Sequence, residues 1–130
     1  MTQIEKRVRD RIADELARVS RWIGALRRET RPEELETGGD NTPLSEAADA
    51  AQAIEEREVN SQLLDWLVGR SVDLRRALRR LDEGIYGICE RCDEFIHPER
   101  LHALPEAALC LKCQTEVERT HAARRAAEPG

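Results

Sequence analysis

All four cysteines of this 130-residue chain lie in one short segment, as two C-x-x-C pairs. Cys89 and Cys92 form the first pair, and Cys110 and Cys113 follow after a spacer of 17 residues. Two such pairs at this spacing indicate a metal site, and four thiolates match the tetrahedral preference of Zn²⁺. Because four protein ligands leave no open position for water or substrate, we expect one structural zinc ion.

The cysteine segment has few large apolar side chains, so it needs the metal in order to fold. Zinc binding supplies on the order of 10 kcal/mol of folding free energy in small domains of this kind. Gly87 directly precedes the first pair and is expected to let the backbone turn toward the sulfur atoms. His97 and His102 could replace a cysteine as ligand, but with four thiols available we expect them to be exposed loop residues.

A second group of chemistry-bearing residues lies in the middle of the chain. Glu46 and Asp49 are three residues apart near the expected start of a helix, and Ala51 follows. This spacing places both carboxylates on one helical face, where the positive end of the helix dipole favours them. On residue types alone they are helix-start acids. A catalytic pair would need a cleft that excludes water, so the chain is not expected to be an enzyme.

A third group consists of four arginines that precede the cysteine segment: Arg75, Arg76, Arg79 and Arg80. Their i,i+4 spacing makes two adjacent basic rows on a helix. They form either a solvated face offset by nearby acids or a docking patch for an acidic protein surface or a phosphate.

The elements that position these groups are expected to be helices. The chain is 40% hydrophobic and 36% charged, and Ala, Leu, Glu and Arg dominate it. A capping-box spacing at Thr2 and Glu5 opens a first helix, which the segment of residues 30–32, with Pro32, should end or kink. A second helix is expected from about residues 43–45 to Glu83, before Gly84. The apolar stripe of the first helix recurs at steps of three and four: Ile4, Val8, Ile12, Leu16, Val19, Ile23 and Leu26.

These patterns predict a mainly α fold of two domains. Residues 1–83 should form a long antiparallel two-helix coiled-coil hairpin, with an acidic tip near residues 36–51. Residues 84–130 should form a small four-cysteine zinc finger followed by a C-terminal helix from about 110 to 127. Between residues 29 and 58 there are ten acidic residues and only Arg31 and Arg57 as bases, so the tip is strongly negative.

Charge and hydropathy exclude several partners. The net charge is −5, and residues 84–130 carry eight acids against six bases, so direct DNA binding is not expected. No stretch approaches the 18 apolar residues of a membrane span, and the charged N-terminus is unlike a signal peptide. We expect a monomeric cytoplasmic protein with no membrane association.

The run "GIYGICERCDEFIHPERLHALPEAALCLKCQ", residues 84–114, resembles the four-cysteine zinc finger of the DksA/TraR family of RNA polymerase-binding transcription factors. The shared pattern comprises G-x-Y-G-x-C-x-x-C, then I-x-x-x-R-L, then A-x-P, and finally the second C-x-x-C followed by Gln114. The preceding arm is similar to that of the longer, DksA-like members.

This resemblance implies that the coiled coil enters the secondary channel of bacterial RNA polymerase, so that its tip nears the catalytic Mg²⁺ and modulates transcription initiation. The family's tip motif, D-x-x-D-x-A, corresponds to Glu46, Asp49 and Ala51, with Glu in place of the first Asp. The positions with which some members help to bind the alarmone ppGpp correspond to Asp73, Leu104 and Gln114. Since none of these is basic, weak or absent ppGpp cooperation is expected.

Two other function classes stay open from the sequence. One is a zinc-ribbon interaction module whose coiled coil recruits a different protein or dimerises. The other is a thiol redox sensor that loses zinc on oxidation.

Overall fold

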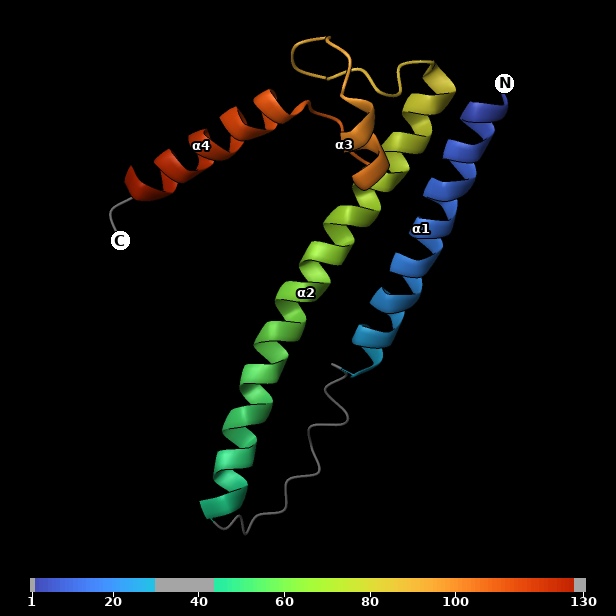
Figure 1. The fold of residues 1–130 in the computed structure, drawn as a ribbon. Coiled ribbons are helices and arrows are strands. Elements are labelled where there is room, and N and C mark those ends of the chain that lie inside the picture. Colours follow the sequence, from blue (N-terminus) through green and yellow to red (C-terminus); the bar gives the residue numbers. More distant parts are fainter. Residues whose placement is uncertain (1, 30–43, 128–130) are drawn as a thin grey trace. The chain divides into compact units, whose positions relative to one another are not determined.

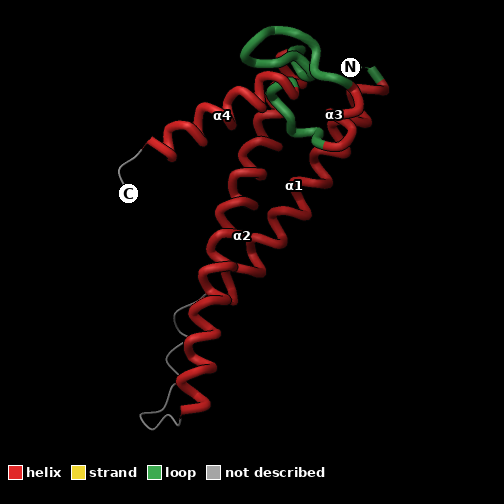
Figure 2. Tube along the Cα trace, turned by 60° about the vertical axis from the view of Figure 1, so that its left-hand side comes forward, coloured by secondary structure: helices red, strands yellow, loops and turns green. Residues whose placement is uncertain are grey.

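The computed structural model describes residues 2–29 and 44–127, with residues 44–46 described by their backbone only. Four helices account for most of this part of the chain: α1 (Gln3–Glu29), α2 (Leu44–Glu83), α3 (Pro98–Ala103) and α4 (Leu111–Ala127) (Figure 1). Within these residues no strand forms, as the tube trace in Figure 2 also shows. The predicted mainly α fold with a long helical hairpin is confirmed, and the short helix α3 is an element that the periodicity did not predict.

The ends of the long helices are fixed by hydrogen bonds that the sequence predicted. At the start of α1, the Thr2 backbone N–H donates to the Glu5 carboxylate at 3.0 Å, and the Glu5 N–H donates to Thr2 Oγ1 at 3.1 Å. This is the reciprocal capping box. At the end of α2, Gly84 has φ 74°, and the N–H groups of Gly84 and Ile85 donate to the carbonyls of Leu81 and Arg80. These two bonds form a Schellman motif, in which glycine takes the left-handed position.

The chain divides into two compact units, and the long helices contribute to both. One unit comprises residues 15–72, and the other comprises residues 1–14 together with 73–130. No helix in the described ranges is long and apolar enough to cross a membrane.

In the unit of residues 15–72, α1 and α2 pack against each other along their apolar stripes. Val19, Ile23, Leu26 and Leu67 are buried. Ser71 takes one position of the stripe of α2 and is also buried, and its hydroxyl donates to the Val68 carbonyl at 2.7 Å. That bond lets a polar residue occupy a core position at little cost.

An ion-pair network crosses between the two helices in the same unit. The Arg70 guanidinium lies 3.1 Å from the Glu15 carboxylate and 5.9 Å from the centre of the Trp66 ring. Arg18 also contacts Glu15, at 2.6 Å. The ion pair joins α1 to α2 in the antiparallel arrangement.

In the unit of residues 1–14 and 73–130, Ile12 of α1 is fully buried together with Leu74 and Ala77 of α2. Arg9 of α1 forms an ion pair with Asp82 of α2. The guanidinium of Arg11 donates to the carbonyl of His102, which belongs to α3. These bonds join the first turns of α1 both to the end of α2 and to the cysteine segment.

Candidate metal centre

The structure brings the four cysteine sulfur atoms together, all within 4.8 Å of one another. The Sγ atoms of Cys92 and Cys110, one from each pair, are 3.8 Å apart. Tetrahedral zinc with Zn–S bonds of about 2.3 Å requires sulfur atoms roughly 3.8 Å apart, and the Cys92–Cys110 separation matches this value. Cys89, Cys92, Cys110 and Cys113 thus form a site for one structural Zn²⁺.

The first cysteine pair is carried by a tight loop. Ile88 and Phe95 form an isolated antiparallel bridge, and the Cys89 N–H donates to the Glu94 carbonyl at 2.8 Å. The chain reverses direction between them through Asp93, whose φ is 60°. Asp is one of the few residues with a side chain that tolerates this left-handed conformation. Gly87, with φ 84°, allows the chain to enter this loop.

The second cysteine pair lies at the start of α4. Cys110 precedes the first helical residue, and its Sγ is 3.5 Å from the Cys113 backbone nitrogen, which donates toward it. The positive end of the helix dipole favours a thiolate at this position. Helix formation from Leu111 onward therefore places both sulfur atoms of this pair.

The protonation of the thiols shows why the cluster needs a cation. Burial raises the pKa of Cys89, but the backbone N–H groups of Cys110, Cys92 and Arg91 more than offset this and lower it to about 6. Burial and the three neighbouring thiols raise the pKa of Cys113 to about 12. The sulfur atoms are too close for all to ionise by themselves, and binding of Zn²⁺ displaces their protons.

A small apolar cluster surrounds the sulfur atoms. Cys89 and Cys113 are buried with Ile96, and Leu101, Leu109 and Cys110 pack against them. The two histidines considered as substitute ligands are both exposed and do not belong to the sulfur cluster. His97 caps α3, its Nδ1 accepting from the Glu99 N–H at 3.3 Å, and the carbonyl of His102 accepts from Arg11.

The predicted arginine patch separates into two kinds of residue. Arg76 and Arg80 both bind the carboxylate of Glu90, which lies between the cysteines of the first pair. Arg75 and Arg79 are exposed and form no ion pair within the described part of the chain. Sequence reasoning missed Glu90 as their partner. The signal in the sequence was the position of Glu90 directly after the ligand Cys89, because a carboxylate beside a thiolate favours a nearby basic side chain.

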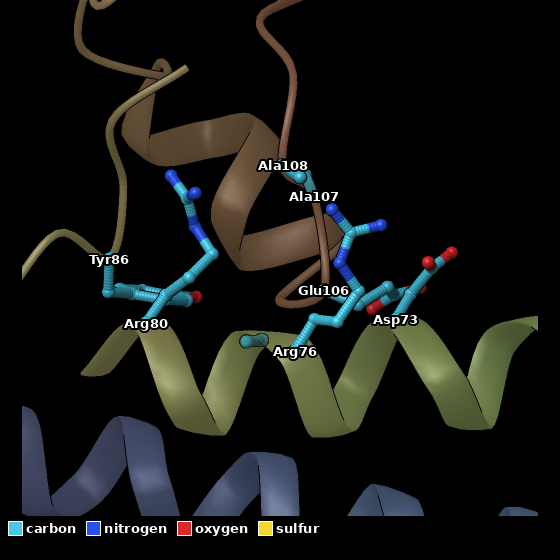
Figure 3. Close-up of a pocket in the computed structure, with 8 residues that line it drawn as sticks. Asp73, Arg76, Arg80, Tyr86, Glu106, Ala107 and Ala108 are labelled. Carbon is cyan, nitrogen blue, oxygen red and sulfur yellow. The ribbon is translucent and has the colours of Figure 1, made fainter. Parts of the chain in front are cut away.

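A shallow pocket lies beside this arginine pair (Figure 3). In this pocket Arg76 and Arg80 project from α2 toward the segment that carries Ala107 and Ala108. The hydroxyl of Tyr86, another lining residue, donates to the Pro105 carbonyl at 2.8 Å. Burial raises the pKa of Asp73; Arg76 opposes this effect and Glu106 adds to it. Sequence reasoning included Tyr86 only as part of the family pattern and did not single out Glu106.

The predicted tip residues fall at the start of α2. Asp49 and Ala51 are exposed, and Glu46 belongs to the helix, but its side chain lies outside the described residues. The part of the predicted tip at residues 36–43 also lies outside them. The tip and the metal site belong to different units of the chain.

A helical hairpin that ends in a zinc-binding four-cysteine finger defines a class of small zinc-finger proteins, and comparison with known proteins shows which of them this chain is similar to. Residues 84–119 match the prokaryotic dksA/traR C4-type zinc finger. Over 98 residues the chain is 29% identical to the RNA polymerase-binding transcription factor DksA of Caulobacter vibrioides, covering 75% of this chain and 69% of that protein. The zinc finger is therefore of the dksA/traR type, and the chain is similar to DksA proteins over most of its length.

Two further relatives extend this comparison. The structure of transcription factor DksA2 from Pseudomonas aeruginosa matches with a TM-score of 0.69 and 26% identity, covering 91% of this chain and 85% of that one. An uncharacterised protein of Aquifex aeolicus is 54% identical over 43 residues, which are 33% of this chain and 30% of that protein. The chain therefore matches less than a third of the length of this last relative.

Proposed function

We propose that this chain binds bacterial RNA polymerase through the secondary channel and modulates transcription initiation without contacting promoter DNA. The observation that carries the proposal is the similarity to a DksA described as RNA polymerase-binding, which extends over 75% of the chain and is not confined to the zinc finger. The zinc site has a structural role in this function, and the protein carries out no bond chemistry.

The start of α2 is the part that we expect to act inside the polymerase. Residues 47–51 are exposed and, apart from Asp49, are all alanine, so the helix here is narrow and carries an exposed carboxylate. A narrow acidic element suits a channel that leads to a site with metal ions and phosphates, where added negative charge changes the local potential. Glu46 and Asp49 would supply this charge, and Ala51 would allow close approach.

Direct DNA binding has little support in the charge of the finger. Arg76 and Arg80 are both engaged by the carboxylate of Glu90, and residues 84–130 carry more acids than bases. Arg75 and Arg79, which are exposed, are the arginines of the predicted patch that remain available to dock on an acidic protein surface.

Cooperation with ppGpp is expected to be weak or absent. Of the three corresponding positions, Asp73 is acidic, Leu104 is apolar, and the Gln114 amide donates to Glu118 at 3.0 Å. None of them supplies a cation for a phosphate. A clear ppGpp-dependent increase in the polymerase response, acting through this protein, would contradict this expectation.

The experiment that tests the proposed function has two stages. The zinc-loaded protein is first titrated against core RNA polymerase, with a known secondary-channel factor as competitor, and competitive binding is expected. Asp49→Asn is then compared in a transcription initiation assay with Asp65→Asn, which removes an exposed carboxylate from α2 outside the tip.

Asp49→Asn should bind the polymerase as the wild type does but lose the effect on initiation, because the change removes charge and keeps shape. Asp65→Asn should retain the effect. No binding at low salt, or full activity of Asp49→Asn, would overturn the proposal; the first result would point to a different protein partner.

A further inference from the structure

The side chain of Arg80 makes contacts on both sides of the first zinc ligand. Its side chain is only 12% exposed, and Nη1 donates to the Glu90 carboxylate at 3.0 Å. Nη2 donates to the carbonyl of Ile85 at 3.2 Å and also to the carbonyl of Ile88. Ile88 and Glu90 are the residues immediately before and after Cys89. The Arg80 side chain therefore holds both neighbours of Cys89: Ile88 through its backbone carbonyl and Glu90 through its carboxylate.

Glu90 is held from two further directions. Arg76 donates to both of its carboxylate oxygens, at 3.2 and 3.1 Å. The Glu90 backbone N–H donates to the carbonyl of Ala108 at 2.9 Å, and Ala108 lies two residues before the ligand Cys110. Figure 3 shows Arg76 and Arg80 projecting from the same side of α2 toward the segments of Tyr86 and Ala108. Glu90 therefore links α2 to the backbone near both cysteine pairs.

The charges explain why a guanidinium is needed here. Four thiolates around Zn²⁺ leave a net charge of about −2, and the Glu90 carboxylate adds another negative charge next to a ligand. Two arginines beside Glu90 offset this excess, and partly buried charge-assisted hydrogen bonds are the strong ones. Planar guanidinium groups can also bridge a carboxylate and carbonyls in a fixed geometry, which a lysine cannot do.

We propose that Arg80 is a positioning residue of the zinc site, which holds the Cys89 loop in its ligating conformation through Ile88 and Glu90, with Arg76 as a second contact to Glu90. The proposal concerns the metal site alone and does not depend on the identity of the protein partner. It assigns to Arg80 a role different from that of Arg75 and Arg79, although all four arginines follow one another on the same helix.

The test measures zinc affinity by competition with a chromophoric chelator. Arg80→Met keeps an unbranched side chain of similar helix propensity but removes the guanidinium donors. Because loss of a partner outside the ligand shell typically costs roughly 10- to 100-fold in metal affinity, we expect a loss in this range. Arg80→Lys should weaken binding less than Arg80→Met. Arg79→Met, which removes an exposed arginine that forms no ion pair in the described part of the chain, is the matched control and should leave affinity unchanged.

A second measurement separates positioning from a general loss of structure. Each protein is exposed to chelator and an alkylating reagent, and the order in which the cysteines are labelled is read by mass spectrometry. In Arg80→Met the first pair, Cys89 and Cys92, should be labelled ahead of Cys110 and Cys113, while the helical circular dichroism signal stays unchanged.

Equal zinc affinity in Arg80→Met and Arg79→Met would overturn the proposal. Simultaneous labelling of all four cysteines would also overturn it, because it would show that the substitution unfolds the finger as a whole. If Arg80→Met cannot be purified, Arg80→Lys takes its place in both measurements, with labelling of the first pair ahead of the second as the supporting result.

Discussion

Replacing Gly87 by Ala should weaken zinc binding through the backbone alone. Gly87 has φ 84°, and a Cβ added there would lie 3.4 Å from Leu101 Cδ1, an ordinary contact. The cost therefore comes from the left-handed conformation, which is about 1–2 kcal/mol for a residue with a side chain. Because the small finger depends on zinc to fold, this cost appears in the metal affinity, as roughly a 5- to 30-fold loss.

The assay is a zinc competition titration, with Gly69→Ala as control. Gly69 lies inside α2, where an added Cβ meets nothing within 4 Å. Alanine there should stabilise the helix by up to about 1 kcal/mol and leave zinc affinity unchanged. If Gly87→Ala bound zinc as tightly as the wild type, either the left-handed entry to the loop or the dependence of finger folding on zinc would be wrong.

Two other substitutions, one of them with a matched control, test the packing and the electrostatics around the finger. Leu74→Ala should lower the free energy of unfolding by about 2–5 kcal/mol, because Leu74 is fully buried. The control Leu111→Ala, at a position 67% exposed, should change the free energy of unfolding little. Urea titration of the helical signal measures both variants, and equal unfolding midpoints would contradict the core assignment. Asp73→Asn should raise stability at neutral pH, because burial raises the pKa of Asp73 above its ordinary 3.8 and its ionised form is therefore disfavoured in the fold. A carboxyl with a raised pKa destabilises the fold when it is ionised and does so less as the pH falls. The gain in stability from Asp73→Asn should therefore shrink as the pH falls toward 3.8. A gain in stability that grows on acidification would show that the pKa of Asp73 is not raised.

Local signals in the sequence predicted the long helices well. The Thr2–Glu5 capping box and Gly84 at the end of α2 act through bonds between residues a few positions apart, so their spacing alone places them. α3 escaped prediction because it has only six residues and too short a period to recognise. Its start depends on His97, which is an uncommon capping residue.

The sequence by itself determined the metal site, because the four cysteines come in local pairs at the spacing that tetrahedral zinc requires. It also established the family resemblance, which resides in the same segment. Only the tertiary structure decided which of the four arginines contact the zinc finger. Arg80 and Glu90 are ten positions apart and belong to different elements, so their pairing depends on how the finger folds against the last turns of α2. Periodicity could show that four arginines share a helix, but it could not show which of them face the carboxylate of Glu90 and which face solvent.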